Sequence, residues 1–145
     1  MKKKSLYINI FPLMCMTILL LFPPSLNAEP LDNWFTVTTA SINDFFYGLA
    51  FGNNTFVAVG ADGIILTSPD GIVWTPRNLL GYPNYFFAVT YGNGKFVAVG
   101  TGGTVLTSST GQIWILRISR TTQFLYDTIY ENSIFVDVGE YGTTL

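Results

Sequence analysis

The chain has 145 residues, the size of one domain at most, and only 11% of them are charged, against a usual share of about 25%. It contains no histidine, and its one cysteine, Cys15, lies in the apolar N-terminal segment, which excludes histidine-based catalysis, an internal disulfide and cysteine metal sites in the remainder. After residue 28 four basic residues stand against nine acidic ones, so the basic surface that binds nucleic acid is absent from the sequence. We expect no cofactor and no metal.

The first 28 residues have the three-part layout of a secretory signal peptide. Three lysines at positions 2–4 precede an apolar run over 6–22, and a cleavage site follows at Ala28. Pro12 and the prolines at 23 and 24 argue against a membrane-spanning helix of about 20 residues, although an uncleaved anchor is the alternative. The residues before Cys15 do not resemble a lipoprotein cleavage site. We therefore expect an exported protein, periplasmic or extracellular, with no stable membrane span after cleavage and a mature part at 29–145.

A phrase of about 40 residues recurs along the mature part. Residues 49–76 read LAFGNNTFVAVGADGIILTSPDGIVWTP, and residues 89–116 read VTYGNGKFVAVGTGGTVLTSSTGQIWIL. Residues 128–145 begin the phrase a third time, as TIYENSIFVDVGEYGTTL. Repeats of this length, rich in glycine turns and β-branched residues, are typical of β-propellers. The sequence therefore predicts an all-β fold of four-stranded antiparallel blades.

Within the first copy, strands are predicted over 46–51, 56–59, 64–68 and from residue 73, with turns at 52–54, 60–63 and 69–71. The second copy places Asn93 and Gly94 in its first turn, the strongest short hairpin signal, because both residues tolerate positive φ. Blades are accordingly expected at 45–77 and 85–117, and an incomplete blade at 124–145.

A lone strand is predicted at 32–37, because Trp34 precedes the first copy at the spacing at which Trp74 precedes the second. The chain then holds about three blades' worth of sequence, whereas closed propellers have roughly four to eight. Three arrangements stay open. The chain is the truncated front of a longer propeller, or two copies complete a ring as a homo-oligomer, or the blades form an open array.

The stretch SPDGIVW at 68–74 resembles the Asp-box of sialidase-superfamily propellers with BNR repeats, and the wider phrase resembles repeats of photosystem II assembly-factor-like propellers. The resemblance covers roughly two thirds of the chain, from Phe45 onward. It implies a structural turn in which the aspartate caps backbone N–H groups and the tryptophan packs beneath. Thr110 replaces the aspartate in the second copy, which predicts a looser corner there. The residues to which the resemblance gives these structural roles are Ser68, Asp70, Gly71 and Trp74, and then Ser108, Gly111 and Trp114.

The hydrolases of that family use three arginines around a substrate carboxylate, a Tyr–Glu pair and an acidic proton donor. The mature part has only Arg77, Arg117 and Arg120, and the first two occupy equivalent positions on outer strands. We therefore expect no catalytic residues and a non-enzymatic binding or scaffolding propeller. A remnant of a secreted sialidase-like glycoside hydrolase is the alternative.

Aromatic residues in the link between the first two blades are the candidate binding surface, because such side chains on a propeller rim can stack on carbohydrate or dock a protein. They are Tyr82, Tyr85 and Phe86, and packing of this link on its own blade is the alternative. Asp137 is a separate anomaly, since it replaces Ala58 and Ala98 in a strand expected to be buried. Either the third copy is degenerate, which we favour, or that strand faces solvent.

Overall fold

The computed structural model describes residues 45–77 and 84–145. The chain divides into two units, Met1–Thr36 and Val37–Leu145, and both described stretches belong to the second unit. The predicted signal peptide, the predicted lone strand at 32–37 and Tyr82 therefore lie outside the described residues. Within the described ranges, no helix is long and apolar enough to cross a membrane.

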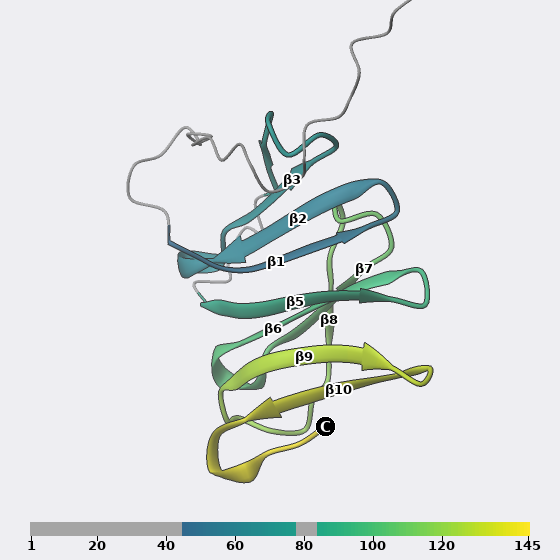
Figure 1. Cartoon of the computed structure of the whole chain (residues 1–145). Coiled ribbons are helices and arrows are strands. Elements are labelled where there is room, and N and C mark those ends of the chain that lie inside the picture. Colours follow the sequence, from purple (N-terminus) through teal and green to yellow (C-terminus); the bar gives the residue numbers. More distant parts are fainter. Residues whose placement is uncertain (1–44, 78–83) are drawn as a thin grey trace, which may run out of the picture. The chain divides into compact units, whose positions relative to one another are not determined.

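Three antiparallel sheets follow one another in chain order, one for each copy of the repeat (Figure 1). The first sheet contains β1 (Phe46–Gly52), β2 (Thr55–Gly60), β3 (Ile65–Ser68) and β4 (Thr75–Pro76). The second contains β5 (Phe86–Gly92), β6 (Lys95–Gly100), β7 (Val105–Ser108) and β8 (Ile115–Arg117). The third contains β9 (Leu125–Glu131) and β10 (Ile134–Gly139). The predicted all-β, propeller-type fold of about three blades is confirmed.

The third sheet also begins a third strand. Asp137 and Leu145 exchange two backbone hydrogen bonds, with N···O distances of 3.1 and 3.0 Å, and Val138 forms a bridge with Thr144. Residues 143–145 thus occupy the place that β3 and β7 hold in the other sheets.

Tight turns join the strands at the predicted places. Each first hairpin closes on residues with positive φ, for example Asn93 at 46° and Gly94 at 72°. After the second strand of each sheet the chain makes a short 3₁₀ turn: η1 (Ala61–Gly63), η2 (Thr101–Gly103) and η3 (Glu140–Gly142). The N–H of Ala61 donates to the carbonyl oxygen of Phe45 at 2.8 Å, and the other two turns make the equivalent bond, so each turn is fastened to the start of its own sheet.

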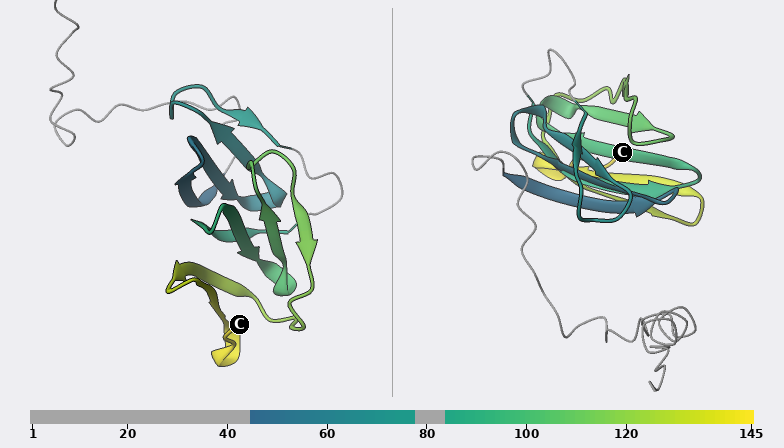
Figure 2. Two further views of the ribbon diagram at one scale, coloured as in Figure 1. Left: turned by 90° about the vertical axis from the view of Figure 1, so that its right-hand side faces the viewer. Right: turned by 90° about the horizontal axis from the view of Figure 1, so that it is seen from above.

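The sheets pack face to face, with β1, β5 and β9 adjacent in succession (Figures 1 and 2). The core between the first and second sheets is formed by Val57, Val59, Ile65, Phe86, Val89, Phe96, Ala98, Leu106 and Trp114. The core between the second and third sheets is formed by Ala88, Val97, Val99, Val105 and Leu125, with Phe135 packed against it. The second sheet is covered on both faces, which explains the unbroken apolar run FVAVG of β6.

Asp137 is buried between the second and third sheets, with only 7% of its surface exposed. The alternative of a solvent-facing strand is therefore wrong for the face of β10 that carries Asp137, although Val138 on the other face is 44% exposed. The Oδ1 of Asp137 and the Oγ1 of Thr128, its cross-strand neighbour, both lack a hydrogen-bond partner. Burial raises the pKa of the Asp137 carboxyl above its ordinary value of 3.8, because the charged form is poorly solvated there.

Candidate binding surface

A β-bulge near the start of the first strand of each sheet turns one aromatic side chain outward. In the first sheet Phe46 pairs with Gly60 and Gly48 pairs with Val59, so Tyr47 has no cross-strand partner. The same shift leaves Phe87 unpaired in the second sheet and Tyr126 in the third. Because a bulge re-aims the extra residue, the three rings leave the faces that pack between sheets.

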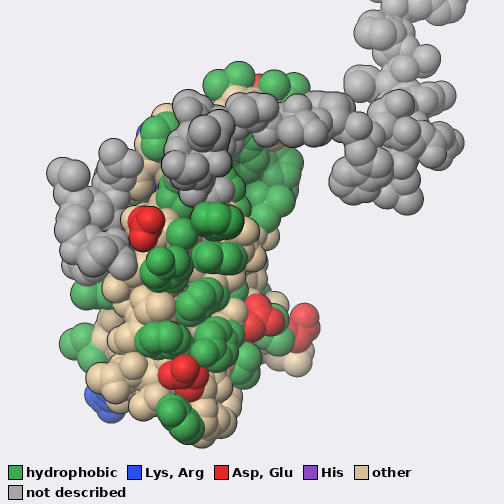
Figure 3. Space-filling model, turned by 90° about the vertical axis from the view of Figure 1, so that its left-hand side faces the viewer, with side chains coloured by type: hydrophobic (Ala, Val, Ile, Leu, Met, Phe, Trp, Pro, Cys, Tyr) green, Lys and Arg blue, Asp and Glu red, His purple; other side chains and the backbone are tan. Residues whose placement is uncertain are grey.

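These rings form one continuous surface, which we call the aromatic stripe. It consists of Tyr47, Phe87 and Tyr126 together with the residues two positions before them, Phe45, Tyr85 and Phe124. The ring centroids of Tyr47 and Phe87 are 5.9 Å apart, and those of Phe87 and Tyr126 are 5.3 Å apart. Figure 3 looks onto the side at which β1, β5 and β9 begin, where hydrophobic side chains gather in a column.

The stripe is largely open to solvent. Phe45 is 66% exposed, Tyr47 and Tyr126 are about half exposed, and Phe87 at the centre is partly buried by its aromatic neighbours. A contiguous exposed apolar patch of this kind marks an interaction site more often than scattered surface residues do.

Glu140 of η3 fixes the end of the stripe that lies on the third sheet. One carboxylate oxygen accepts the phenolic hydroxyl of Tyr126 at 3.0 Å, and the other accepts the backbone N–H of Phe124 at 3.3 Å. The hydrogen bond to Glu140 raises the pKa of the Tyr126 phenol above its ordinary value of 10.0, so the ring stays neutral at physiological pH. The stripe is therefore uncharged along its length, with a carboxylate at this end.

The predicted binding surface corresponds to the stripe only in part. Tyr85 belongs to the stripe, 40% exposed, with its ring 6.5 Å from that of Tyr47. Phe86 is fully buried in the core between the first two sheets, so its prediction as a surface residue is wrong: it lies on the packed side of the bulge. Sequence reasoning missed the bulge residues, although an aromatic residue occupies that position in all three copies.

Side-chain hydrogen bonds to the backbone close the turn between β3 and β4. Asp70 Oδ1 accepts the backbone N–H groups of Ile72 at 2.9 Å and Val73 at 3.0 Å, and it accepts the Ser68 hydroxyl at 3.0 Å. The Trp74 indole N–H donates to the carbonyl of Gly71 at 3.1 Å. The bonds from Val73 and Ile72, and then the bond from Ser68, lower the pKa of Asp70 below 3.8.

The corresponding turn of the second sheet keeps all but one of these bonds to the backbone. Gly111 donates its N–H to Ser108 at 2.8 Å, and Trp114 donates to the Gly111 carbonyl at 2.9 Å. The Thr110 hydroxyl accepts a single backbone N–H, that of Gln112 at 3.2 Å, where Asp70 accepts two. This turn therefore has one fewer backbone hydrogen bond than the turn at Asp70.

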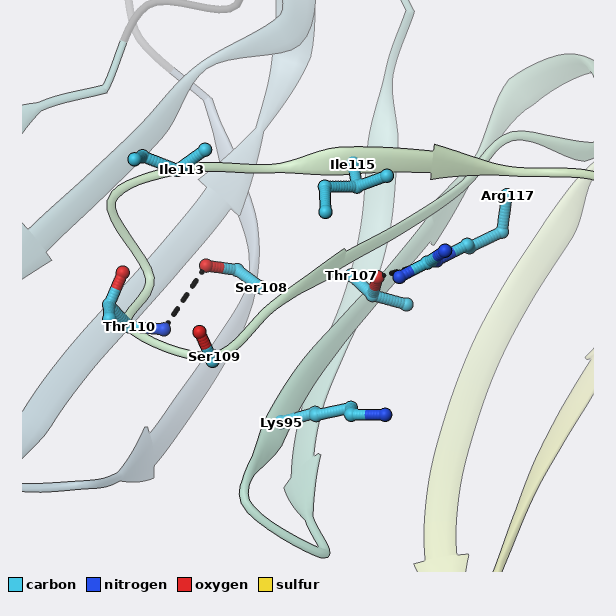
Figure 4. A pocket seen from close by; sticks show the side chains of 8 residues that line it. All are labelled: Lys95, Thr107, Ser108, Ser109, Thr110, Ile113, Ile115 and Arg117. Atoms are coloured by element: carbon cyan, nitrogen blue, oxygen red, sulfur yellow. Dashed lines mark hydrogen bonds between the residues drawn. The ribbon is translucent and has the colours of Figure 1, made fainter.

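An open cleft of about 320 Å³ lies beside the second turn (Figure 4). Lys95 and Arg117 give it positive charge, and hydroxyl groups of β7 and the β7–β8 turn line the remainder together with the apolar side chains of Ile113 and Ile115. Arg117 is held at one side by a 2.8 Å hydrogen bond from its Nε to Thr107. None of the described residues that line this cleft is a carboxylate.

Arg77 and Arg117 each make a hydrogen bond within their own sheet. Arg77 follows β4 and donates through Nε to Thr67 at 2.9 Å, and Arg117 makes the equivalent bond within its own sheet. Each is thus hydrogen-bonded to the third strand of its own sheet, β3 or β7. Among the described residues, no three potential metal ligands are grouped together.

Comparison with known proteins supports the fold. No protein-family model matches the chain, and no curated protein matches it by sequence. The solved structure "YCF48 bound to D1 peptide" is similar over 73% of this chain, with a TM-score of 0.57 and 20% identity, and the match spans 36% of the length of that protein. The computationally designed Ika4 protein matches over 79% of this chain and 97% of its own, with a TM-score of 0.42 and 15% identity. YCF48 is a photosystem II assembly factor with a β-propeller fold, and the likeness therefore supports a propeller-type fold here.

Proposed function

We propose that this chain is an exported, non-catalytic binding module whose aromatic stripe holds a segment of a protein partner. The observation that carries the proposal is the repeated bulge, which places an outward-turned ring at the same position of three successive sheets. Aromatic rings of this kind supply large contact area at low entropic cost, and they dominate the energetics of protein interfaces.

The dimensions of the stripe suit an extended peptide. The successive bulge rings are 5.9 and 5.3 Å apart, close to the spacing of roughly 6.6 Å between alternate side chains of an extended chain. A similar fold in YCF48 is described with a bound D1 peptide, which favours a protein segment over a carbohydrate as the ligand. Export rests on the signal-peptide pattern of residues 1–28.

The test is to select peptides from a random display library against the folded chain and to measure the affinity of a labelled selected peptide by fluorescence anisotropy. Tyr47→Ser and Tyr126→Ser should each weaken binding about tenfold, the effect of losing an aromatic hot spot. Ile118→Ser is the matched control, since Ile118 is 90% exposed and lies outside the stripe.

Two results would overturn the proposal. One is a selected peptide that binds both stripe variants as tightly as it binds the unmodified chain. The other is selection of no peptide while a glycan array gives binding that depends on Tyr47, because the ligand would then be a carbohydrate.

A further inference from the structure

The outer face of the first sheet exposes three apolar side chains whose counterparts elsewhere are covered. Phe46, Leu49 and Phe51, which we call the β1 face, are 37%, 62% and 55% exposed. In the second sheet these positions hold Phe86, Val89 and Tyr91, which belong to or pack against the core shared with the first sheet. In the third sheet they hold Leu125, Thr128 and Tyr130, and the first two are buried. The repeat thus uses this face as an interface between sheets.

Both junctions within the chain close in the same way, with a ring seated over a glycine. The ring of Tyr91 in the second sheet covers Gly52 at the end of β1, so closely that any β-carbon on Gly52 would overlap it. The ring of Tyr130 in the third sheet covers Gly92 at the end of β5 in the same manner. Phe51 is the equivalent ring of the first sheet, and its face packs on no sheet within the described residues.

The face of the third sheet that points away from the second sheet carries different residues at the positions that form this junction in the other copies. Glu131 stands where Gly52 and Gly92 receive a ring, and Asp127 stands where Gly48 and Ala88 allow close approach. Both carboxylates are exposed. If another sheet docked there in the same geometry, its aromatic ring would meet the Glu131 side chain where the other junctions have a glycine. Docking would also bury two charges against apolar residues, which costs several kcal/mol unless the charges are paired.

We propose that the β1 face binds a sheet of the same repeat type on a partner chain, while Asp127 and Glu131 prevent copies of this chain from stacking on one another. The partner sheet ends its first strand in glycine opposite Phe51 and has glycine or alanine four residues earlier. Its second strand presents β-branched side chains at the positions of Val57 and Val59, which form this surface in the existing junction. This interface is distinct from the aromatic stripe and does not depend on it.

A probe with the required partner surface can be made from the chain itself. Asp127→Ala and Glu131→Gly give the third sheet the residues of the second copy, Ala88 and Gly92. Phe51→Asp in the same molecule stops the probe from stacking on itself. Sedimentation velocity should show the unmodified chain alone and the probe alone as monomers, and an equimolar mixture as a one-to-one complex. Phe51→Asp in the otherwise unmodified chain is the matched control and should weaken the complex tenfold or more.

A folded probe that does not bind the unmodified chain would overturn the proposal. So would dimers of the unmodified chain that Phe51→Asp dissociates, because the β1 face would then bind its own copy. A large loss of thermal stability in the Phe51→Asp chain would show that a segment of the same chain covers this face, which also contradicts it. If the triple variant does not fold, the Asp127→Ala, Glu131→Gly double variant replaces it, and it must form concentration-dependent head-to-tail oligomers that the unmodified chain does not form.

Discussion

At the scale of single residues, Asp137 is the position at which the third copy conflicts with its surroundings. The other two copies place alanine there, and both alanines are buried. The carboxylate gains no hydrogen bond through Oδ1 in return for its burial. An unpaired buried polar group of this kind destabilises a fold by about 1–3 kcal/mol.

Asp137→Ala should therefore stabilise the chain by roughly 1–3 kcal/mol at neutral pH. Because burial raises the folded-state pKa of Asp137, the folded state favours the neutral acid. The chain is therefore most stable with respect to this group below pH 3.8, where the carboxyl is neutral in both states. That stability is lost as the pH rises through the raised pKa of the folded state. Urea unfolding between pH 3 and 8 should show that decline in the unmodified chain.

The alanine variant should have a flatter pH profile than the unmodified chain, and Asp127→Asn, on the exposed face of the same sheet, should leave the decline in place. An alanine variant with the unmodified profile would show that another group causes the pH dependence.

At the scale of elements, the strands and hairpins could be predicted because glycine and asparagine mark every turn of the repeat. The bulges could not, because a shift of one residue in pairing leaves the sequence pattern almost unchanged. That shift decides that Phe86 enters the core and Phe87 enters the stripe. The Asp70 turn could be predicted in more detail, since its hydrogen bonds join residues only two or three positions apart in the sequence.

The residues at the equivalent positions of the β3–β4 and β7–β8 turns, Asp70 and Thr110, can be exchanged by mutation. Thr110→Asp should raise the melting temperature, because a carboxylate can accept a second backbone N–H in that turn, and Asp70→Thr should lower it for the opposite reason. The pKa of Asp70 is lowered on folding, so its stabilising effect is present above its ordinary value of 3.8 and is lost as the pH falls through the folded value.

Differential scanning calorimetry at pH 7 and near pH 2 checks both statements. The difference between Asp70→Thr and the unmodified chain should shrink at the lower pH. Equal melting temperatures at pH 7 would show that the capping bonds contribute nothing to stability.

At the scale of the whole described region, the chain is a linear series in which each sheet depends on its neighbour. Repeat proteins of this type gain their stability from the repeats and from nearest-neighbour interfaces. The first junction buries nine core residues and the second buries five, and the third sheet has fewer strands than the others. The third sheet should therefore separate first when the junctions are weakened.

Gly92→Val tests this order of stability. The valine side chain would overlap the ring of Tyr130, so the junction between the second and third sheets should lose roughly 1–3 kcal/mol. Hydrogen exchange should then accelerate in β9 and β10 while β2, β3, β6 and β7 keep their protection, because the larger first junction remains closed. Gly52→Val is the matched variant and should instead separate the first sheet. Uniform acceleration across all three sheets in both variants would mean that the chain unfolds as one cooperative unit, and that the junctions are not independent contributors to stability.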